Sequence, residues 1–134
     1  MRLLVVPIVL AAVALTGCAS TSTSSTKYTG AAADVDKAIN DLHTAGQRKD
    51  SAKLCSQILA GAIVTKLGGS AKCQDAMDKL IADADEFTMD VRSIKVNGSQ
   101  ATASIRQGDK GATRTLTFTR EANRWKVSSF QPAS

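Results

Sequence analysis

The chain has 134 residues, of which 43% are hydrophobic and 4% aromatic, and its formal net charge at pH 7 is +5. A chain of this length holds one domain with a modest hydrophobic core. The scarcity of aromatic side chains excludes a surface on which nucleic-acid bases stack, and nucleic acid is not a predicted partner.

The first predicted element is an N-terminal export signal. Arg2 supplies a positive start, and the almost wholly apolar stretch 3–16 follows it. A membrane-spanning helix needs about 20 apolar residues, so this stretch is too short to span a bilayer. A basic start and a short apolar segment are typical of a signal peptide, and residues 1–17 are predicted to be one.

The apolar stretch ends in Leu15-Thr16-Gly17-Cys18, an aliphatic residue, two small residues and a cysteine. This tetrapeptide resembles the bacterial lipobox. The resemblance implies that the Cys18 thiol receives a diacylglycerol, that the signal peptide is cut off before Cys18, and that acyl chains such as palmitate anchor the mature chain. The implied location is the cell envelope, on the extracytoplasmic side of a bacterial membrane, with the choice between inner and outer membrane left open. The alternative is an ordinary secretory signal in which Cys18 occurs by chance.

A tether is predicted between the lipidated cysteine and the domain. Residues 20–26 are seven consecutive Ser and Thr, which offer too little apolar surface to pack into a core. Residues 18–30 are therefore interpreted as the lipidated Cys and a Ser/Thr tether, and residues 31–134 as the globular domain.

The first half of this domain has the period of amphipathic helices. One helix is predicted to begin at an Asp34 cap and to bury Val35, Ile39 and Leu42. A second helix follows Asp50 and ends before Gly68-Gly69, because two glycines break it. Ser70 is predicted to cap a third helix.

Two cysteines, Cys55 and Cys73, fall on the apolar faces of the second and third helices. An even number of cysteines in an exported chain indicates a disulfide, and packing of the two helices would bring the sulfurs together. Two buried thiols remain the alternative. A metal site is not predicted, because the spacing of the cysteines and the single histidine does not match known ligand pairs.

The second half of the domain has the period of strands. The hairpin turn Asn97-Gly98 and a predicted bulge near Arg92-Ser93 mark its beginning. The predicted strands are residues 87–96, 100–106, 112–120 and 124–130, with turns at 97–98, 108–111 and 121–123. Helices followed by an antiparallel meander predict an α+β fold with three N-terminal helices packed on a four-stranded sheet.

This order resembles the nuclear-transport-factor-2-like superfamily, which includes ketosteroid-isomerase-like proteins. The stretch RTLTFTREANRWKVSSF resembles the last two strands of that superfamily, and IKVNGSQATASI resembles its central hairpin. The Cys55 and Cys73 arrangement resembles small actinobacterial-type exported members. The resemblance implies a curved sheet wrapped around a long helix, with a conical cavity. A strand that members often have between the second and third helices is not evident, which would leave the cavity smaller and partly open.

Candidate cavity residues follow from the inward face of the predicted sheet and from the one histidine. Small and large apolar side chains there leave room for a small apolar ligand, although they equally serve as core. The candidates are Ala101, Ala103, Leu116, Phe118, Trp125 and His43. Enzymes of the resembling fold use a carboxylate base in such a cavity, but no partner is evident for Asp85 or Asp90, so no enzyme activity and no cofactor is predicted.

Charge separates the two halves of the domain, because residues 91–134 hold eight basic and two acidic side chains. A basic sheet could dock on an anionic envelope polymer or lipid, while the simpler interpretation is a sheet kept soluble by its arginines. The candidate anion-facing residues are Arg92, Arg106, Arg114, Arg124 and Lys126. The sequence thus favours an anchored, non-catalytic domain that binds a small ligand or an envelope protein, with docking on anions and an isomerase- or cyclase-like enzyme as alternatives.

Overall fold

The computed structural model describes residues 27–82, 88–107 and 111–131. The predicted signal peptide, Cys18, the Ser/Thr tract and most of the predicted turn at 108–111 lie outside these ranges. In chain order the helices are α1 (Ala31–Gln47), α2 (Ser51–Lys53), the π-helix η1 (Leu54–Ile58), α3 (Gly61–Lys66) and α4 (Ser70–Ala82). The strands are β1 (Met89–Asn97), β2 (Gln100–Gln107), β3 (Thr113–Glu121) and β4 (Arg124–Gln131).

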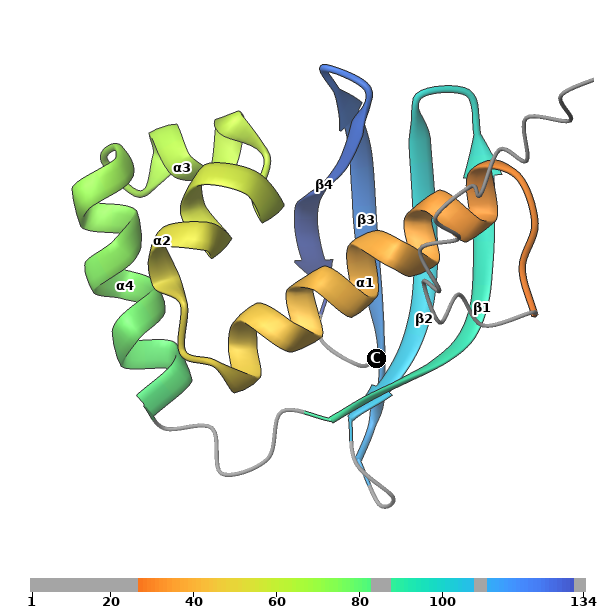
Figure 1. The fold of residues 1–134 in the computed structure, drawn as a ribbon, viewed down its shortest axis with the longest axis horizontal. Coiled ribbons are helices and arrows are strands. Elements are labelled where there is room, and N and C mark those ends of the chain that lie inside the picture. The colour runs from red at the N-terminus through yellow and green to blue at the C-terminus, as the bar shows by residue number, and fades with distance from the viewer. Residues whose placement is uncertain (1–26, 83–87, 108–110, 132–134) are drawn as a thin grey trace, which may run out of the picture.

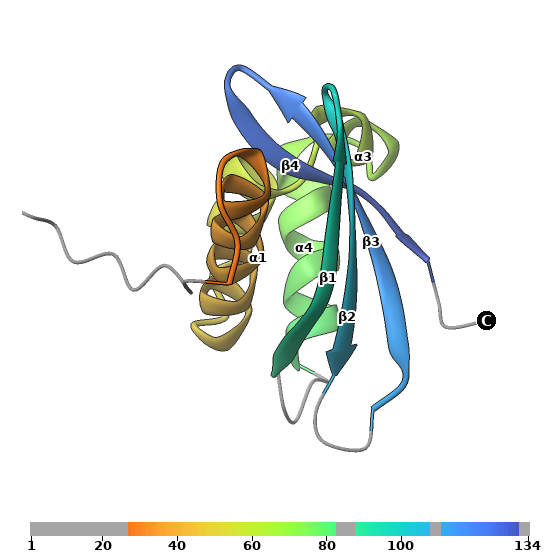
Figure 2. The ribbon, with the colours of Figure 1, turned by 90° about the vertical axis from the view of Figure 1, so that its right-hand side faces the viewer.

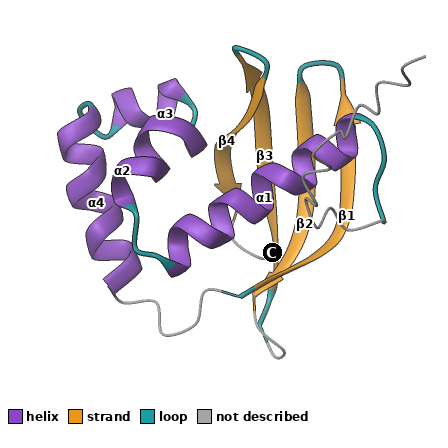
Figure 3. Cartoon of the chain, in the orientation of Figure 1, coloured by secondary structure: helices purple, strands orange, loops and turns teal. Residues whose placement is uncertain are grey.

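The four strands form one antiparallel sheet in the order β1-β2-β3-β4, so the predicted meander is confirmed. Helix α1 runs diagonally across one face of the sheet (Figure 1). Helix α4 lies beyond β4, with the α2–η1 segment and α3 between them. Figure 2 shows the sheet edge-on, with α1 on one side of it. The separation of helices from strands along the chain is also a separation in space (Figure 3), which makes the fold α+β.

The two hairpin turns that the structure describes in full, β1–β2 and β3–β4, have two residues each and contain positive φ angles. Gly98 has φ 60° and opens the β1–β2 turn, one residue later than the predicted turn. Ala122 and Asn123 have φ 47° and 62° and form the β3–β4 turn. Two successive positive φ angles suit a turn whose twist matches that of the strands. The predicted bulge in β1 is confirmed, because the register shifts between Val91 and Ser93.

The core lies between α1 and the inner face of the sheet. Alternate strand residues point into it, and Phe118, at the centre of β3, is fully buried. The predicted stripe Val35, Ile39 and Leu42 covers this face from α1. The threonines between the buried residues of β3 lie on the opposite face, as the period of two predicts.

The helices differ from the prediction at two points. Helix α1 begins at Ala31, and the Gly30 carbonyl accepts hydrogen bonds from the N–H groups of Ala33 (3.0 Å) and Asp34 (3.3 Å), so Asp34 lies in the first turn instead of capping it. The predicted second helix is broken into α2, η1 and α3. At the break, Leu59 adopts an extended conformation and forms an isolated parallel bridge with Val127 of β4.

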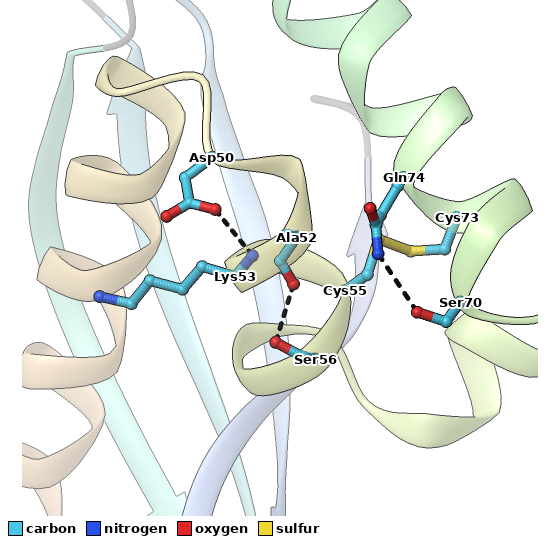
Figure 4. The surroundings of a disulfide bond; sticks show 8 residues. All are labelled: Asp50, Ala52, Lys53, Cys55, Ser56, Ser70, Cys73 and Gln74. Carbon is cyan, nitrogen blue, oxygen red and sulfur yellow. Dashed lines mark hydrogen bonds between the residues drawn. A yellow bond between two sulfur atoms is a disulfide. The ribbon is translucent and has the colours of Figure 1, made fainter.

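The predicted disulfide between Cys55 and Cys73 is confirmed, and its Cα atoms are 6.0 Å apart. It joins η1 to α4, and both cysteines are buried (Figure 4). The Asp50 side chain accepts a hydrogen bond from the Lys53 N–H at 2.9 Å and so caps α2, which begins directly after Asp50 as predicted. These contacts fix the helical segment α2–η1, which packs directly against α1.

Candidate functional site

A cleft of about 210 Å³ opens between α1, the α2–η1 segment and the β3–β4 hairpin. Its walls come from three parts of the chain that are distant in sequence but meet at the β4 edge of the sheet. The lining residues are Asp34, Lys37, Ala38, Asp41, Lys53, Gln57, Ile58, Phe118, Asn123, Arg124, Trp125 and Val127.

The floor of the cleft is apolar and rigidly held. Phe118, Val127 and Ile58 belong to the hydrophobic core and line the cleft from below. Trp125 is only 6% exposed, and the Arg120 guanidinium lies 5.9 Å from the centroid of its ring, within cation–π range. A ligand in the cleft would therefore rest on a preformed apolar surface.

One wall is a face of α1. Asp34, Lys37, Ala38 and Asp41 recur at the spacing i, i+3, i+4 and i+7, which places them on one side of a helix. The two aspartates and the lysine are exposed, and Ala38 between them is half-buried. The small Ala38 side chain leaves the space that larger neighbours would fill.

The π-turn in η1 shapes the opposite wall. The Leu59 N–H donates to the Leu54 carbonyl at 2.8 Å, five residues earlier, which widens the helix by one residue. The widened turn contributes Gln57 and Ile58 to the cleft. The Arg124 guanidinium donates to Gln57 Oε1 at 3.3 Å, so the hairpin and the π-turn are held together at the cleft mouth. Single π-turns within helices are frequent at functional sites.

The two walls carry opposite charge. The α1 wall has two carboxylates and one ammonium group, whereas the other wall has the cations of Lys53 and Arg124 with the amides of Gln57 and Asn123. Among the residues described, no ion pair within 4.0 Å joins Asp34 or Asp41 to a lysine or arginine. The carboxylates of Asp34 and Asp41 are thus open to a ligand.

A buried polar atom belongs to the same cleft. The Trp125 indole N–H is buried and has no hydrogen-bond acceptor in the part of the chain that the structure describes. Buried indole N–H groups usually have a partner, so this group is an exception among side chains of its kind.

The predicted cavity residues divide into two groups. Phe118 and Trp125 line the cleft, whereas Ala101, Ala103 and Leu116 are buried in the core beneath α1. His43 is half-buried on α1 and is not among the residues that line the cleft.

The predicted anion-facing residues do not gather on one surface. Arg106 and Lys126 lie on the outer face of the sheet, opposite Thr113 and Thr119 in the register. Arg114 pairs with the buried Ile105 and so belongs to the inner face, beyond the core. Arg92 forms a 3.2 Å ion pair with Asp90, Lys126 lies 3.8 Å from Glu121, and Arg124 lines the cleft.

Most of the polar lining was missed by the sequence reasoning. The α1 residues Asp34, Lys37 and Asp41 look like an ordinary solvent-exposed helix face, and the helical spacing was the one signal that groups them. Lys53, Gln57 and Asn123 approach this face through the broken helix and the last hairpin, which the sequence pattern does not reveal.

Two further properties concern the described ranges. Across residues 27–82, 88–107 and 111–131, no group of three or more His, Cys, Asp or Glu side chains is arranged to hold a metal ion. Within the same ranges, none of the helices combines the length and apolar character needed to cross a membrane.

Comparison with known proteins found no protein-family model that matches the chain and no curated protein sequence that matches it. The geometry of the cleft is therefore the basis for the proposals that follow.

Proposed function

We propose that this chain is a non-catalytic lipoprotein of the bacterial cell envelope whose domain binds a small ligand in the cleft between α1 and β4. The observation that carries the binding role is a cleft with an apolar floor between two walls of opposite charge. Trp125 lines this cleft, and its buried indole N–H has no acceptor in the described part of the chain. Apolar pockets with a few convergent polar groups are the usual form of small-molecule sites.

The proposed cellular location, outside the cytosol and anchored to a membrane, is supported by two independent features. The disulfide between Cys55 and Cys73 is of the kind that persists in oxidising compartments outside the cytosol. The tetrapeptide that ends in Cys18 supports lipidation, and two or more acyl chains would hold the chain firmly on a membrane.

The proposed relationship to nuclear-transport-factor-2-like domains is supported by the long helix α1 laid across a four-stranded meander. The bridge between Leu59 and Val127 stands where many members have an extra strand, and it is confined to one residue pair. A reduced strand at this point agrees with a small cleft at the β4 edge.

An isomerase- or cyclase-like activity is less well supported by the geometry. Such a reaction needs a carboxylate within an apolar cavity. Asp34 and Asp41 are exposed on the cleft rim, and the buried Asp36 already has an interaction partner and is not part of the lining. The carboxylates of the cleft are therefore placed to hold a charged group at the rim.

The binding role can be tested by native mass spectrometry of the full chain purified in detergent from its own membranes. We expect the protein to retain a small molecule, and the variant Ala38→Leu, which fills the cleft, to lose it. Ala71→Leu makes the same change on the exposed side of α4 and should retain the molecule. A spectrum with the protein mass alone, or equal retention by Ala38→Leu, would contradict the proposal.

A further inference from the structure

We infer that the ligand of this cleft is a zwitterion with a short apolar body, of the amino-acid or short-peptide class. This inference rests on the proposed binding function and adds the chemistry of the ligand. The cleft shows three features that such a molecule matches one by one: a wall with carboxylates, a wall with cations and an apolar floor.

The apolar floor and the volume of the cleft determine the polarity and size of the ligand body. Phe118 and Val127 are fully or almost fully buried, so the apolar surface that a ligand can cover comes mainly from Ala38, with small contributions from Ile58 and Trp125. The cleft of about 210 Å³ is smaller than the roughly 300–1,000 Å³ of pockets that hold drug-sized molecules. The ligand body is therefore about the size of one or two aliphatic side chains.

The cationic wall sets the position of a ligand carboxylate. Lys53 and Arg124 lie on the side of the cleft formed by α2 and the β3–β4 hairpin. Figure 4 shows the Lys53 side chain extended from α2 in the direction of α1. Arg124 and Trp125 both line the cleft, so a ligand carboxylate can approach the guanidinium while the ligand body lies near the indole.

The acidic wall sets the position of a ligand ammonium group. Asp34 and Asp41 are two helical turns apart on α1, and no ion pair within 4.0 Å occupies either carboxylate in the described part of the chain. A wholly apolar ligand would cover these charged groups without replacing their water, which is unfavourable. A ligand with both charges satisfies each wall.

The test is a titration of the full chain in detergent with L-leucine, N-acetyl-leucine and leucinamide. N-acetyl-leucine lacks the ammonium group and leucinamide lacks the carboxylate, whereas all three share the apolar body. Trp125 is the only tryptophan in the chain, so its fluorescence reports on the cleft directly, and calorimetry provides a second measurement. We expect leucine to bind about threefold to fivefold more tightly than either derivative, the range for contacts between solvent-exposed charges.

Two variants test which wall of the cleft binds the ammonium group of the ligand and which binds its carboxylate. Asp41→Asn should abolish the preference for leucine over N-acetyl-leucine, and Arg124→Gln should abolish the preference for leucine over leucinamide. Asp78→Asn and Arg48→Gln make the same changes at exposed positions away from the cleft and should preserve both preferences. The selective loss of one preference at a time distinguishes contact with the ligand from damage to the fold.

A parallel titration with leucyl-leucine distinguishes the two kinds of zwitterion, a free amino acid and a short peptide. Tighter binding than leucine would indicate a peptide, and weaker binding a free amino acid. Equal affinity for leucine and its two derivatives, or absence of binding by all zwitterions, would overturn the inference. The proposed binding function would still stand if native mass spectrometry showed a retained molecule of another class.

Discussion

Phe118 belongs both to the hydrophobic core and to the floor of the cleft, so the same side chain contributes to the stability of the fold and to the shape of the proposed site. Phe130, on the neighbouring strand, is 54% exposed and makes a matched control. We expect Phe118→Ala to lower the free energy of unfolding by about 3–5 kcal/mol, because it removes a fully buried ring and leaves a cavity. Phe130→Ala should change it by less than about 1 kcal/mol, because much of that ring remains in water.

Urea unfolding followed by circular dichroism would measure both changes on the full chain in detergent. A loss of about 3–5 kcal/mol is a large part of the roughly 5–15 kcal/mol that stabilises a domain. Equal midpoints for Phe118→Ala and the unchanged protein would show that β3 does not occupy the centre of the core.

Residues with strong local preferences were predictable from the sequence, and residues positioned by distant contacts were not. The alternation around Phe118 fixed which side chains of β3 face inward, and the Asp50 cap marked the start of α2. Leu59 looks helical in sequence but is extended in the fold, because the bridge to Val127 and the hydrogen bond from Ala60 N–H to the Val127 carbonyl (2.8 Å) compete with the helix. The cleft depends on that break, so its polar lining could not be predicted.

At the scale of elements, α4 is the helix most dependent on the disulfide. It packs on α2, η1 and α3, and Cys73 and Ile81 are its buried residues. A helix with so little buried apolar surface is held weakly by packing, and the link from Cys73 to Cys55 holds it covalently. The disulfide also reduces the number of conformations open to the unfolded chain. This effect stabilises the fold by about 3 kcal/mol for a loop of this size.

The double variant Cys55→Ala/Cys73→Ala should therefore lose about 3 kcal/mol of stability, and amide exchange should accelerate in α4 more than in β2 and β3. Hydrogen exchange with mass spectrometry would locate the change. Ser56→Ala, an exposed neighbour of Cys55 in η1, is the control and should leave exchange in α4 unchanged. Uniform acceleration across the sheet would mean that α4 and the sheet unfold as one unit.

For the whole molecule, the described end of the predicted tether and the β3–β4 side of the cleft lie at different edges of the sheet. The Lys27 ammonium donates to the Val91 carbonyl at 3.2 Å and lies 5.3 Å from the Tyr28 ring centroid, so the described end of the tether contacts β1 at one edge of the sheet. The cleft lies at the opposite edge, beside β4. The last residues of the segment interpreted as tether thus contact the packed domain.

This arrangement predicts that anchoring and binding are independent. Cys18→Ser should abolish incorporation of labelled palmitate and move the protein out of the membrane fraction, because the serine hydroxyl does not accept the diacylglycerol that the lipobox resemblance implies. Ser20→Ala leaves Leu15-Thr16-Gly17-Cys18 intact and should remain labelled and membrane-bound. Both variants should bind the ligand of the cleft with the affinity of the unchanged chain, since neither position lies in the domain. Palmitate labelling of Cys18→Ser would place the lipid on another residue, and loss of binding in that variant would show that the anchor contributes to the site.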